Sequence, residues 1–513
     1  MPRAALLVCL AFLAVGCGGA PPPSAGPAPD PPKVAELRAG AAKIEITNKK
    51  ALPPRDPLYV KALVLKSDTT TAVLVTLDAV AVGEIGHVPN DYLEKVRARL
   101  RKELDIPPAA VIVNASHCHG VPCADVDEKT VEAVKAAHAN LVPVKVGVGV
   151  GSESRVSENR RLRLKSGKEA DVRHAYSLPP DDEVVGVGPI DPRIGVLRVD
   201  ELDGRTLAVV YHFACHPIMG VNGDGNTADL VGFASKVIED STGAVALFVQ
   251  GCGGDINPVR YKDVHHPRHA EPLGNTLGLS LLQAVRKITC AAGAPLAVCN
   301  DPLALPRADH AERIEALAAE HARLVKNLKG TTLNLKSFLE LSAKYNSSKD
   351  FPSFDSHLYL TEKDQGRADL RQLDEANRRD LRAYAENVLT MEKLTRVQTN
   401  LALLRKHEAT NRAAGRAPLK VEVAGLRVGE FVLVTFPGEL TVEIGLNVQK
   451  SAAHKTTFVS GYTNGYLYYT PTAAQLRNTG EAQEDCDTVV APEWEQLFYA
   501  KAADTLKALG VGR

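Results

Sequence analysis

The chain has 513 residues, of which 45% are hydrophobic and 24% charged, so its composition is that of a globular protein with a large buried core. Its 61 Lys and Arg residues balance 61 Asp and Glu residues, and a formal net charge of zero argues against a basic surface for nucleic acid or anionic membranes. Length alone allows two to four domains of about 150 residues.

The first 19 residues have the pattern of a bacterial lipoprotein signal peptide. Arg3 precedes an apolar run that is too short to span a bilayer. The segment Ala14-Val15-Gly16-Cys17 resembles a lipobox, in which Cys17 is the lipidation site. Residues 20–36 are rich in proline and are expected to form a semi-extended tether. We therefore expect a membrane-anchored lipoprotein of the bacterial cell envelope, periplasmic or on the outer surface; a plain secretory signal peptide is the alternative.

From Leu37 onward, short β-branched apolar runs alternate with amphipathic segments. The apolar runs predict strands at Ala42–Ile46, Tyr59–Leu65, Ala72–Leu77, Ala109–Asn114, Val144–Val150, Ile194–Val199, Leu207–Phe213 and Val245–Gln250. The amphipathic segments predict helices at Tyr92–Leu104, with Asn90 as its N-cap, and at Thr130–Leu141 and Leu230–Asp240. Strands separated by helices indicate an α/β fold in which helices pack outside the sheets.

Residues 308–416 differ in composition from the rest of the chain, because they are highly charged and poor in β-branched residues. Apolar residues recur at three-to-four spacing from Leu373 to Leu404, which predicts one long amphipathic helix. We interpret this segment as a structural helical insertion hinged about Phe351-Pro352-Ser353. The alternative is that it shapes or covers a substrate cleft. Strands are predicted again at Leu419–Leu426 and Phe431–Phe436, followed by a last helix at Trp494–Leu509.

The strand predicted at Ala109–Asn114 leads into the motif Asn114-Ala115-Ser116-His117-Cys118-His119-Gly120. Alternate side chains of an extended chain point the same way, so His117 and His119 are expected to project together from the strand end. Two imidazoles on one side are typical of a catalytic zinc site whose other ligands come from distant parts of the chain. A chance pair among 15 histidines is the alternative.

This motif resembles the Thr-His-Thr-His-Ser-Gly-Pro signature of the neutral, non-lysosomal ceramidase family, which are zinc amidases. Four further segments resemble that family's motifs in the same order: Tyr211-His212-Phe213-Ala214-Cys215-His216-Pro217, Gln250-Gly251-Cys252-Gly253-Gly254-Asp255-Ile256-Asn257-Pro258, Phe436-Pro437-Gly438-Glu439 and Asn464-Gly465-Tyr466-Leu467-Tyr468-Tyr469. The resemblance runs from about Leu37 to the C-terminus. It implies a four-layer α/β/β/α sandwich, here without the C-terminal immunoglobulin-like domain of the larger ceramidases.

The resemblance also implies a ligand set for one zinc ion per chain. By motif position the ligands are His117, His216, Glu439 and Tyr469. Glu439 is expected to open a helix at Leu440–Gln449, where the helix dipole favours a carboxylate; an ordinary first-turn carboxylate is the alternative. A phenol ionises near pH ~10, so tyrosine is the weakest ligand, and Tyr466 and Tyr468 compete for its place.

Other residues of these motifs are candidates for catalysis or substrate binding. His119 is expected to lie near the metal and to transfer a proton or stabilise an oxyanion. Asp255, like Asp229, is suited to orienting a metal-bound histidine or the attacking water, with helix capping as the alternative. Arg160, in a segment that resembles the family's Asn-Arg-Ser-Pro, is expected to bind a polar head group; a solvated arginine-rich loop is the alternative.

Two departures from the family pattern bear on the reaction. Asn257, which we assign to substrate binding, stands where the family has a serine, so a mechanism that needs that hydroxyl is in doubt. Activation of water by zinc does not need it. A second family tyrosine, which contacts substrate, falls near Gly480-Glu481 and is missing, which weakens the specific prediction of ceramide hydrolysis.

Seven cysteines remain after Cys9 and Cys17, so at least one is expected to be free. Cys118, Cys215 and Cys252 lie inside the motifs, and a cysteine-rich zinc site is therefore an alternative. The resemblance favours a role as small buried residues instead. Cys290 and Cys299 are near enough in sequence for a disulfide, although nothing requires one.

We predict a zinc-dependent amidohydrolase that cleaves the N-acyl amide bond of ceramide-like lipids to a fatty acid and an amine, the sphingoid base. Its expected partners are a lipid or N-acyl amide substrate and the membrane, through the N-terminal lipid anchor; no nucleic acid or protein partner is implied. The alternatives are a hydrolase of another linear amide or ester, and a non-catalytic binding lipoprotein that retains the fold.

Overall fold

The computed structural model describes residues 36–172, 178–220, 225–261, 265, 268–347, 356–478 and 482–512. Within it, Glu36–Arg513 forms one compact unit. The predictions for the signal peptide, Cys17, the tether up to residue 35, the hinge at Phe351-Pro352-Ser353 and the segment Gly480-Glu481 lie outside the described residues.

The eight strands predicted before residue 251 form one sheet in the order β12-β11-β10-β5-β1-β2-β3-β4. Its strands are β1 (Arg38–Glu45), β2 (Tyr59–Lys66), β3 (Thr71–Leu77), β4 (Val111–Ala115), β5 (Val142–Ser152), β10 (Arg193–Glu201), β11 (Thr206–Phe213) and β12 (Val245–Gln250). Most neighbours are antiparallel, but β4 pairs parallel to β3 and β12 parallel to β11. His117 follows the edge strand β4, which pairs with β3, and His216 follows β11, which pairs with the other edge strand, β12. The strands β3, β4 and β11 are mostly apolar and buried.

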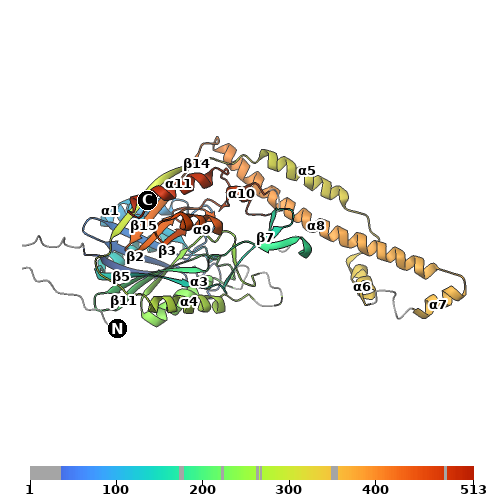
Figure 1. The fold of residues 1–513 in the computed structure, drawn as a ribbon, viewed down its shortest axis with the longest axis horizontal. Coiled ribbons are helices and arrows are strands. Elements are labelled where there is room, and N and C mark those ends of the chain that lie inside the picture. The colour runs from blue at the N-terminus through green and yellow to red at the C-terminus, as the bar shows by residue number, and fades with distance from the viewer. Residues whose placement is uncertain are drawn as a thin grey trace, which may run out of the picture. The chain divides into compact units, whose positions relative to one another are not determined.

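Four helices, α1 (Tyr92–Leu104), α2 (Val126–Ala139), α3 (Asp229–Thr242) and α4 (Ala270–Arg286), pack on this sheet (Figure 1). Val96 of α1 and Val134 of α2 share one buried cluster with Val75 of β3. Leu230 of α3 and Leu281 of α4 belong to a second cluster, with strands β10, β11 and β12. The predicted helices are confirmed, but Asn90 does not cap α1: the N-cap is Asp91, and Asn90 Oδ1 accepts from the backbone N–H of Glu84.

A second sheet has the order β14-β15-β16-β18. Its strands are β14 (Leu296–Leu305), β15 (Leu419–Val428), β16 (Phe431–Thr435) and β18 (Thr457–Ser460). Leu426 and Phe458 of this sheet share a buried cluster with Leu63 and Leu197 of the first, so the two sheets have a common core. A further cluster joins the second sheet to α9 (Val442–Ser451) and α11 (Trp494–Ala508).

Three small sheets and the helical insertion complete the described fold. The sheets are β13-β6, β17-β19 and β8-β7-β9, built from β6 (Ser157–Asn159), β7 (Arg161–Leu164), β8 (Glu169–Asp171), β9 (Val184–Val187), β13 (Ile256–Pro258), β17 (Glu439–Leu440) and β19 (Tyr469–Thr470). The insertion contains α5 (Ala311–Asn327), α6 (Leu335–Asn346), α7 (Ser356–Asp364) and α8 (Asp369–Ala413), and a short α10 (Ala473–Leu476) follows later. The long helix predicted from Leu373 to Leu404 is thus confirmed as part of α8, along which α5 packs (Figure 1).

Within the part of the chain that the structure describes, no helix combines the length and the apolar character that a membrane crossing requires.

Candidate metal centre

Three side chains from separate segments, His117, His216 and Glu439, meet in one buried group. His216 Nε2 lies 3.1 Å from Glu439 Oε2, and His117 Nε2 lies 3.6 Å from the same oxygen. The two imidazole rings are 4.9 Å apart between centroids. Each residue is only 2% exposed. The sequence assigned all three to the metal, and the fold brings them together.

The backbone around His117 differs from the predicted extended chain. Strand β4 ends at Ala115, and His117 adopts a left-handed conformation with φ 65°. This turn is held by a hydrogen bond from the His117 N–H to the carbonyl of Ala79 (3.0 Å). The prediction that His117 and His119 project alike from a strand end is therefore wrong: His117 is buried, whereas His119 is exposed, although their ring centroids are only 5.5 Å apart.

Glu439 is positioned by a short strand rather than by a helix. Residues Glu439 and Leu440 form β17, which pairs parallel to β19, and α9 begins only at Val442. The prediction that Glu439 opens a helix and gains from its dipole is therefore wrong. In the β17–β19 register Glu439 lies opposite Tyr469, which brings two predicted ligands side by side.

Both histidines turn one ring nitrogen toward the backbone. His117 Nδ1 lies 2.6 Å from the carbonyl oxygen of Val80, and His216 Nδ1 lies 3.1 Å from that of Ile256. A carbonyl accepts only, so each Nδ1 carries the proton and each Nε2 keeps its lone pair toward Glu439. Backbone acceptors of this kind fix the tautomer of metal-binding histidines in proteins. The donor set thus suits a divalent cation such as zinc.

The protonation states of the group also suit a cation. Burial lowers the pKa of His117 to about 4, so its imidazole is neutral at neutral pH. Burial alone would raise the pKa of Glu439, but the adjacent His117 and His216 outweigh burial and hold it well below its usual range. A neutral imidazole and an ionised carboxylate are the forms that bind metals.

Four tyrosines near the group have different surroundings. Tyr469 Oη lies 3.5 Å from His216 Nε2, which is consistent with its predicted place beside the metal. Tyr466 donates to Glu439 Oε1, and Tyr462 donates to Glu439 Oε2 (3.3 Å). Burial raises the pKa of both, which keeps these two hydroxyls protonated as donors. Tyr468 instead packs on His407 of α8, with ring centroids 4.6 Å apart.

Sequence reasoning missed Tyr462. Its ring lies against that of His117, with centroids 4.3 Å apart, and it is fully buried. The residue precedes the Asn464–Tyr469 motif and has φ 53°, so no strand or helix periodicity pointed to it. Only its position in the tertiary structure identifies it as a support for both His117 and Glu439.

Arg160 connects the metal-binding group to a buried acidic network. Its guanidinium donates to four protein acceptors, namely Tyr469 Oη (3.2 Å), Asn257 Oδ1 (3.0 Å), the Gly254 carbonyl and Glu484. Arg160 is 2% exposed and Arg161 is 1% exposed, so the alternative of a solvated arginine-rich loop is wrong. The role predicted for Arg160 in binding a polar head group stays a prediction.

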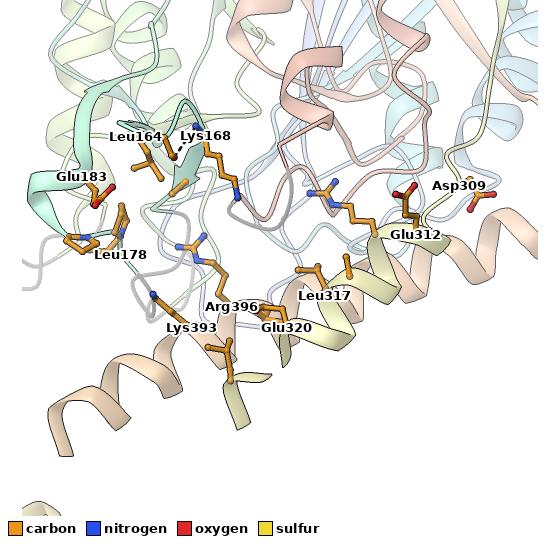
Figure 2. A pocket seen from close by; sticks show the side chains of 18 residues that line it. Leu164, Lys168, Leu178, Glu183, Asp309, Glu312, Leu317, Glu320, Lys393 and Arg396 are labelled. Atoms are coloured by element: carbon orange, nitrogen blue, oxygen red, sulfur yellow. Dashed lines mark hydrogen bonds between the residues drawn. The ribbon is translucent and has the colours of Figure 1, made fainter. Parts of the chain in front are cut away.

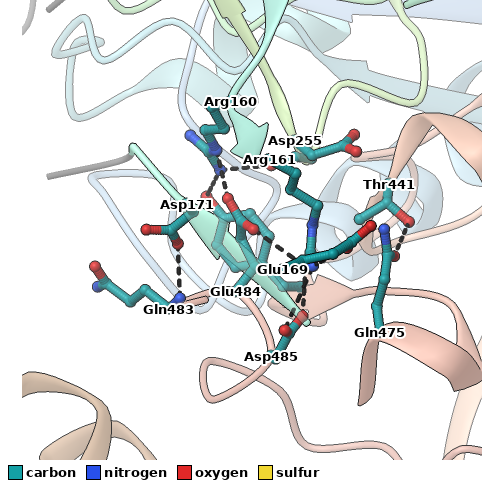
Figure 3. Close-up of polar contacts among 12 residues, drawn as sticks. Arg160, Arg161, Glu169, Asp171, Asp255, Thr441, Gln475, Gln483, Glu484 and Asp485 are labelled. Atoms are coloured by element: carbon teal, nitrogen blue, oxygen red, sulfur yellow. Dashed lines mark hydrogen bonds and ion pairs between the residues drawn. The ribbon is translucent and has the colours of Figure 1, made fainter. Parts of the chain in front are cut away.

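The acidic network surrounds the two arginines (Figure 3). Arg161 pairs with Asp485 and, at 3.0 Å, with Glu169 of β8. Arg396 of α8 donates to Asp171 Oδ1 (3.1 Å), whose other oxygen accepts from the backbone N–H of Gln483 (2.6 Å). The long helix of the insertion is thereby connected to the loop that carries Glu484, the partner of Arg160.

Asp255 and Asp229 accept backbone hydrogen bonds at helix starts. Asp255 Oδ1 accepts from the N–H of Val442, the first residue of α9 (2.8 Å), and Oδ2 accepts from Asn159 Nδ2 (3.0 Å). Asp229 Oδ1 accepts from the N–H of Leu230 in α3 (2.7 Å). The contact of Asp255 with Val442 fits the capping alternative, whereas Asp229 is the first residue of α3, whose N-cap is Ala228. The catalytic role of Asp255 stays a prediction.

The seven described cysteines are unpaired, so Cys290 and Cys299 form no disulfide. Burial raises the pKa of Cys118, Cys215 and Cys252 well above its usual value, which keeps each thiol protonated. Among the described residues, the group spaced to hold a metal contains no cysteine. The cysteine-rich zinc site is therefore not supported.

A cavity of about 920 Å³ lies between the β8-β7-β9 sheet and the insertion (Figure 2). Leu164 of β7, Leu317 of α5 and Arg396 of α8 line it. None of the three metal-binding side chains is among its lining residues, so the cavity is separate from the metal centre. The idea that the insertion shapes a substrate cleft stays a hypothesis.

Comparison with known proteins supports the fold. No protein-family model matches the sequence, and no curated protein matches it. Among solved structures, a neutral ceramidase from Pseudomonas aeruginosa superposes with a TM-score of 0.56 at 16% identity, covering 93% of this chain and 75% of that one. A ceramidase complexed with C2 gives a TM-score of 0.57 at the same identity and coverage. At this identity the likeness establishes a shared fold, in agreement with the resemblance found in the motifs.

Proposed function

We propose that this chain, which has the fold of the neutral ceramidases, is a zinc-dependent hydrolase. It cleaves the N-acyl amide bond of ceramide-like lipids to a fatty acid and an amine. The observation that carries the proposal is the buried group of His117, His216 and Glu439, in which two Nε2 atoms face one carboxylate. The fold alone would not specify a reaction, since one fold supports many.

The ligands of the proposed zinc are His117 Nε2, His216 Nε2 and Glu439 Oε2, with Tyr469 Oη as the fourth. When bound, zinc supplies a Lewis acid and lowers the pKa of a water molecule to about 7. The hydroxyls of Tyr462 and Tyr466 hold the Glu439 carboxylate in place by donating to it. Arg160 donates a hydrogen bond to the Tyr469 hydroxyl.

His119 is the proposed proton-transfer residue. Its ring is adjacent to that of His117, but it is exposed, so a substrate approaching the metal centre would meet it first. A neutral imidazole there would donate to the oxyanion that forms at the acyl carbon, or give a proton to the departing amine. Asp255 would act through Asn159 and α9, as a positioning residue.

Two further proposals concern the layer architecture of the fold and the cellular location of the protein. The common core between the two large sheets, together with helix clusters on each, supports a four-layer α/β/β/α sandwich. The lipobox at Cys17 and the proline-rich tether support a lipoprotein anchored to a membrane of the bacterial cell envelope.

The rival functions are hydrolysis of another linear amide or ester, and binding without turnover. Asn257 and the missing family tyrosine favour these rivals, whereas the intact metal-binding group favours an enzyme. The test is to assay the purified, zinc-loaded protein on a panel that contains ceramide, simpler N-acyl amides and the matching esters. Cleavage of ceramide in preference to the other compounds supports the proposal. Cleavage of esters alone, or of nothing on the panel, overturns it.

A further inference from the structure

Asn257 is a fully buried residue beside the metal centre. It lies in β13, next to Ile256, whose carbonyl oxygen accepts from both the backbone N–H and the Nδ1 of His216. Its side chain reaches Arg160, which in turn contacts Tyr469. Two hydrogen bonds therefore separate the Asn257 amide from the Tyr469 hydroxyl, a proposed zinc ligand.

The contact with Arg160 fixes how the Asn257 amide is oriented. A guanidinium can only donate, so the atom that faces Arg160 Nη1 at 3.0 Å must be the amide oxygen. The amide nitrogen then points elsewhere with two N–H groups. Asn257 Nδ2 is buried and has no hydrogen-bond partner among the residues that the structure describes.

An unpartnered N–H in a protein interior is destabilising, and buried amides normally have acceptors. If the residue served only to hold Arg160, an aspartate of the same shape would give the guanidinium a second ionic partner beside Glu484 and leave no unpaired donor. The asparagine instead leaves a hydrogen-bond donor, Nδ2, available for a ligand. The proposed metal ligands are similarly buried, His216 at 2% and Tyr469 at 3%, so burial does not distinguish Asn257 from residues that the proposed function requires to meet the substrate.

We propose that Asn257 Nδ2 donates a hydrogen bond to an oxygen atom of the bound amide substrate. The acceptor is either the oxygen of the scissile carbonyl or a hydroxyl oxygen on the amine half of an N-acyl amino alcohol. This inference rests on the proposed hydrolase function and assigns a specific atom to substrate recognition. It also gives the residue that replaces the family's serine a role that requires no nucleophile.

The test uses two variants of the full chain in detergent. Asn257→Asp retains an oxygen for Arg160, but it replaces the donor by a second oxygen and adds a negative charge, whereas Asn257→Ala removes both atoms without adding charge. Each is compared with the wild type on a pair of N-acyl amides that differ by one hydroxyl on the amine half. The readouts are kcat/KM, the Kd of the intact amide by calorimetry, the zinc content and the melting temperature.

Asn257→Asp is expected to retain zinc and to lose about tenfold to a hundredfold in kcat/KM or Kd. A loss confined to the hydroxylated amide assigns the donor to the hydroxyl, and an equal loss on both amides in both variants, with zinc content and melting temperature unchanged, assigns it to the scissile carbonyl. The inference is overturned when Asn257→Asp matches the wild type on both amides while Asn257→Ala is impaired, because the residue then only holds Arg160.

Two further outcomes are separable from these. A wild type that cleaves neither amide counts against the proposed function, and the Kd comparison on the intact amides then still decides the role of Asn257. If Asn257→Asp does not fold, a crystal structure of the wild type with a non-cleavable amide decides it. A substrate oxygen within hydrogen-bond distance of Nδ2 supports the inference, and a water molecule there in its place refutes it.

Discussion

Glu439 and Tyr469 lie directly opposite each other in the parallel pair β17–β19, and Tyr469 Oη approaches the His216 imidazole that Glu439 also contacts. A two-stranded sheet of this size has little stability of its own. Its register nevertheless decides which of the clustered tyrosines reaches the metal centre.

Replacing Tyr469 by Phe is expected to weaken zinc binding by about tenfold or more, since it removes an oxygen from the ligand set. Tyr468→Phe is the matched control, because Tyr468 packs on His407 and its ring is retained. Zinc affinity measured by competition with a chelator distinguishes the two variants. If Tyr466→Phe lost the metal while Tyr469→Phe retained it, the ligand would be Tyr466.

The purified protein is expected to contain about one zinc ion per chain, and His117→Ala or His216→Ala should remove it. Both imidazoles face the same carboxylate oxygen, and among the described residues no other histidine belongs to the metal-binding group. His138→Ala, in α2, is the control and should stay loaded. Elemental analysis of the dialysed proteins gives the answer, and full zinc occupancy in the first two variants would refute the assignment.

His119→Ala is expected to keep its zinc but lose turnover by about a hundredfold to ten-thousandfold, the usual effect of losing a positioned proton-transfer or oxyanion group. Substrate binding should change less than kcat. Steady-state kinetics should show the loss in kcat, and zinc analysis should show an unchanged metal content. A metal-free His119→Ala beside a loaded His117→Ala would mean that the two roles are exchanged, and a fully active variant would mean that His119 transfers no proton.

Single changes of Cys118, Cys215 or Cys252 to Ala are expected to leave the zinc content unchanged. Burial holds the pKa of each thiol above its ordinary value, so below that pKa the thiol is protonated and is neither a nucleophile nor a ligand. The same reasoning predicts slow reaction of these thiols with an aromatic disulfide at pH 7 until the protein is unfolded. Rapid labelling with loss of zinc would restore the cysteine-rich site as an explanation.

Cys17→Ser is expected to release the protein from membranes, because one cysteine carries the whole acyl anchor and the tether that follows is proline-rich. Fractionation of cells that express the two forms measures this. Retention of the variant in the membrane fraction would show that another part of the chain binds lipid.

The strands, most helices and the side chains of the candidate metal-binding group could be predicted from the sequence. β2, β3, β11 and β12 are short apolar runs, and α8 has a sustained helical period, so each is specified by residues close together in the chain. His117, His216 and Glu439 lie in compact motifs, which made them recognisable without knowing their distances.

The orientation of those side chains depends on contacts that form only in the folded chain. His117 is turned inward by its own left-handed backbone conformation, in which its N–H donates to the carbonyl of Ala79. Glu439 is aligned by β19, a partner strand distant in sequence. Arg160 is buried because Glu484, far along the chain, neutralises it. Local periodicity carries no information about such contacts, since their energy comes from groups that meet only when the chain is folded. For the same reason, only the folded structure reveals that the Nδ2 of Asn257 has no acceptor within the described part of the chain.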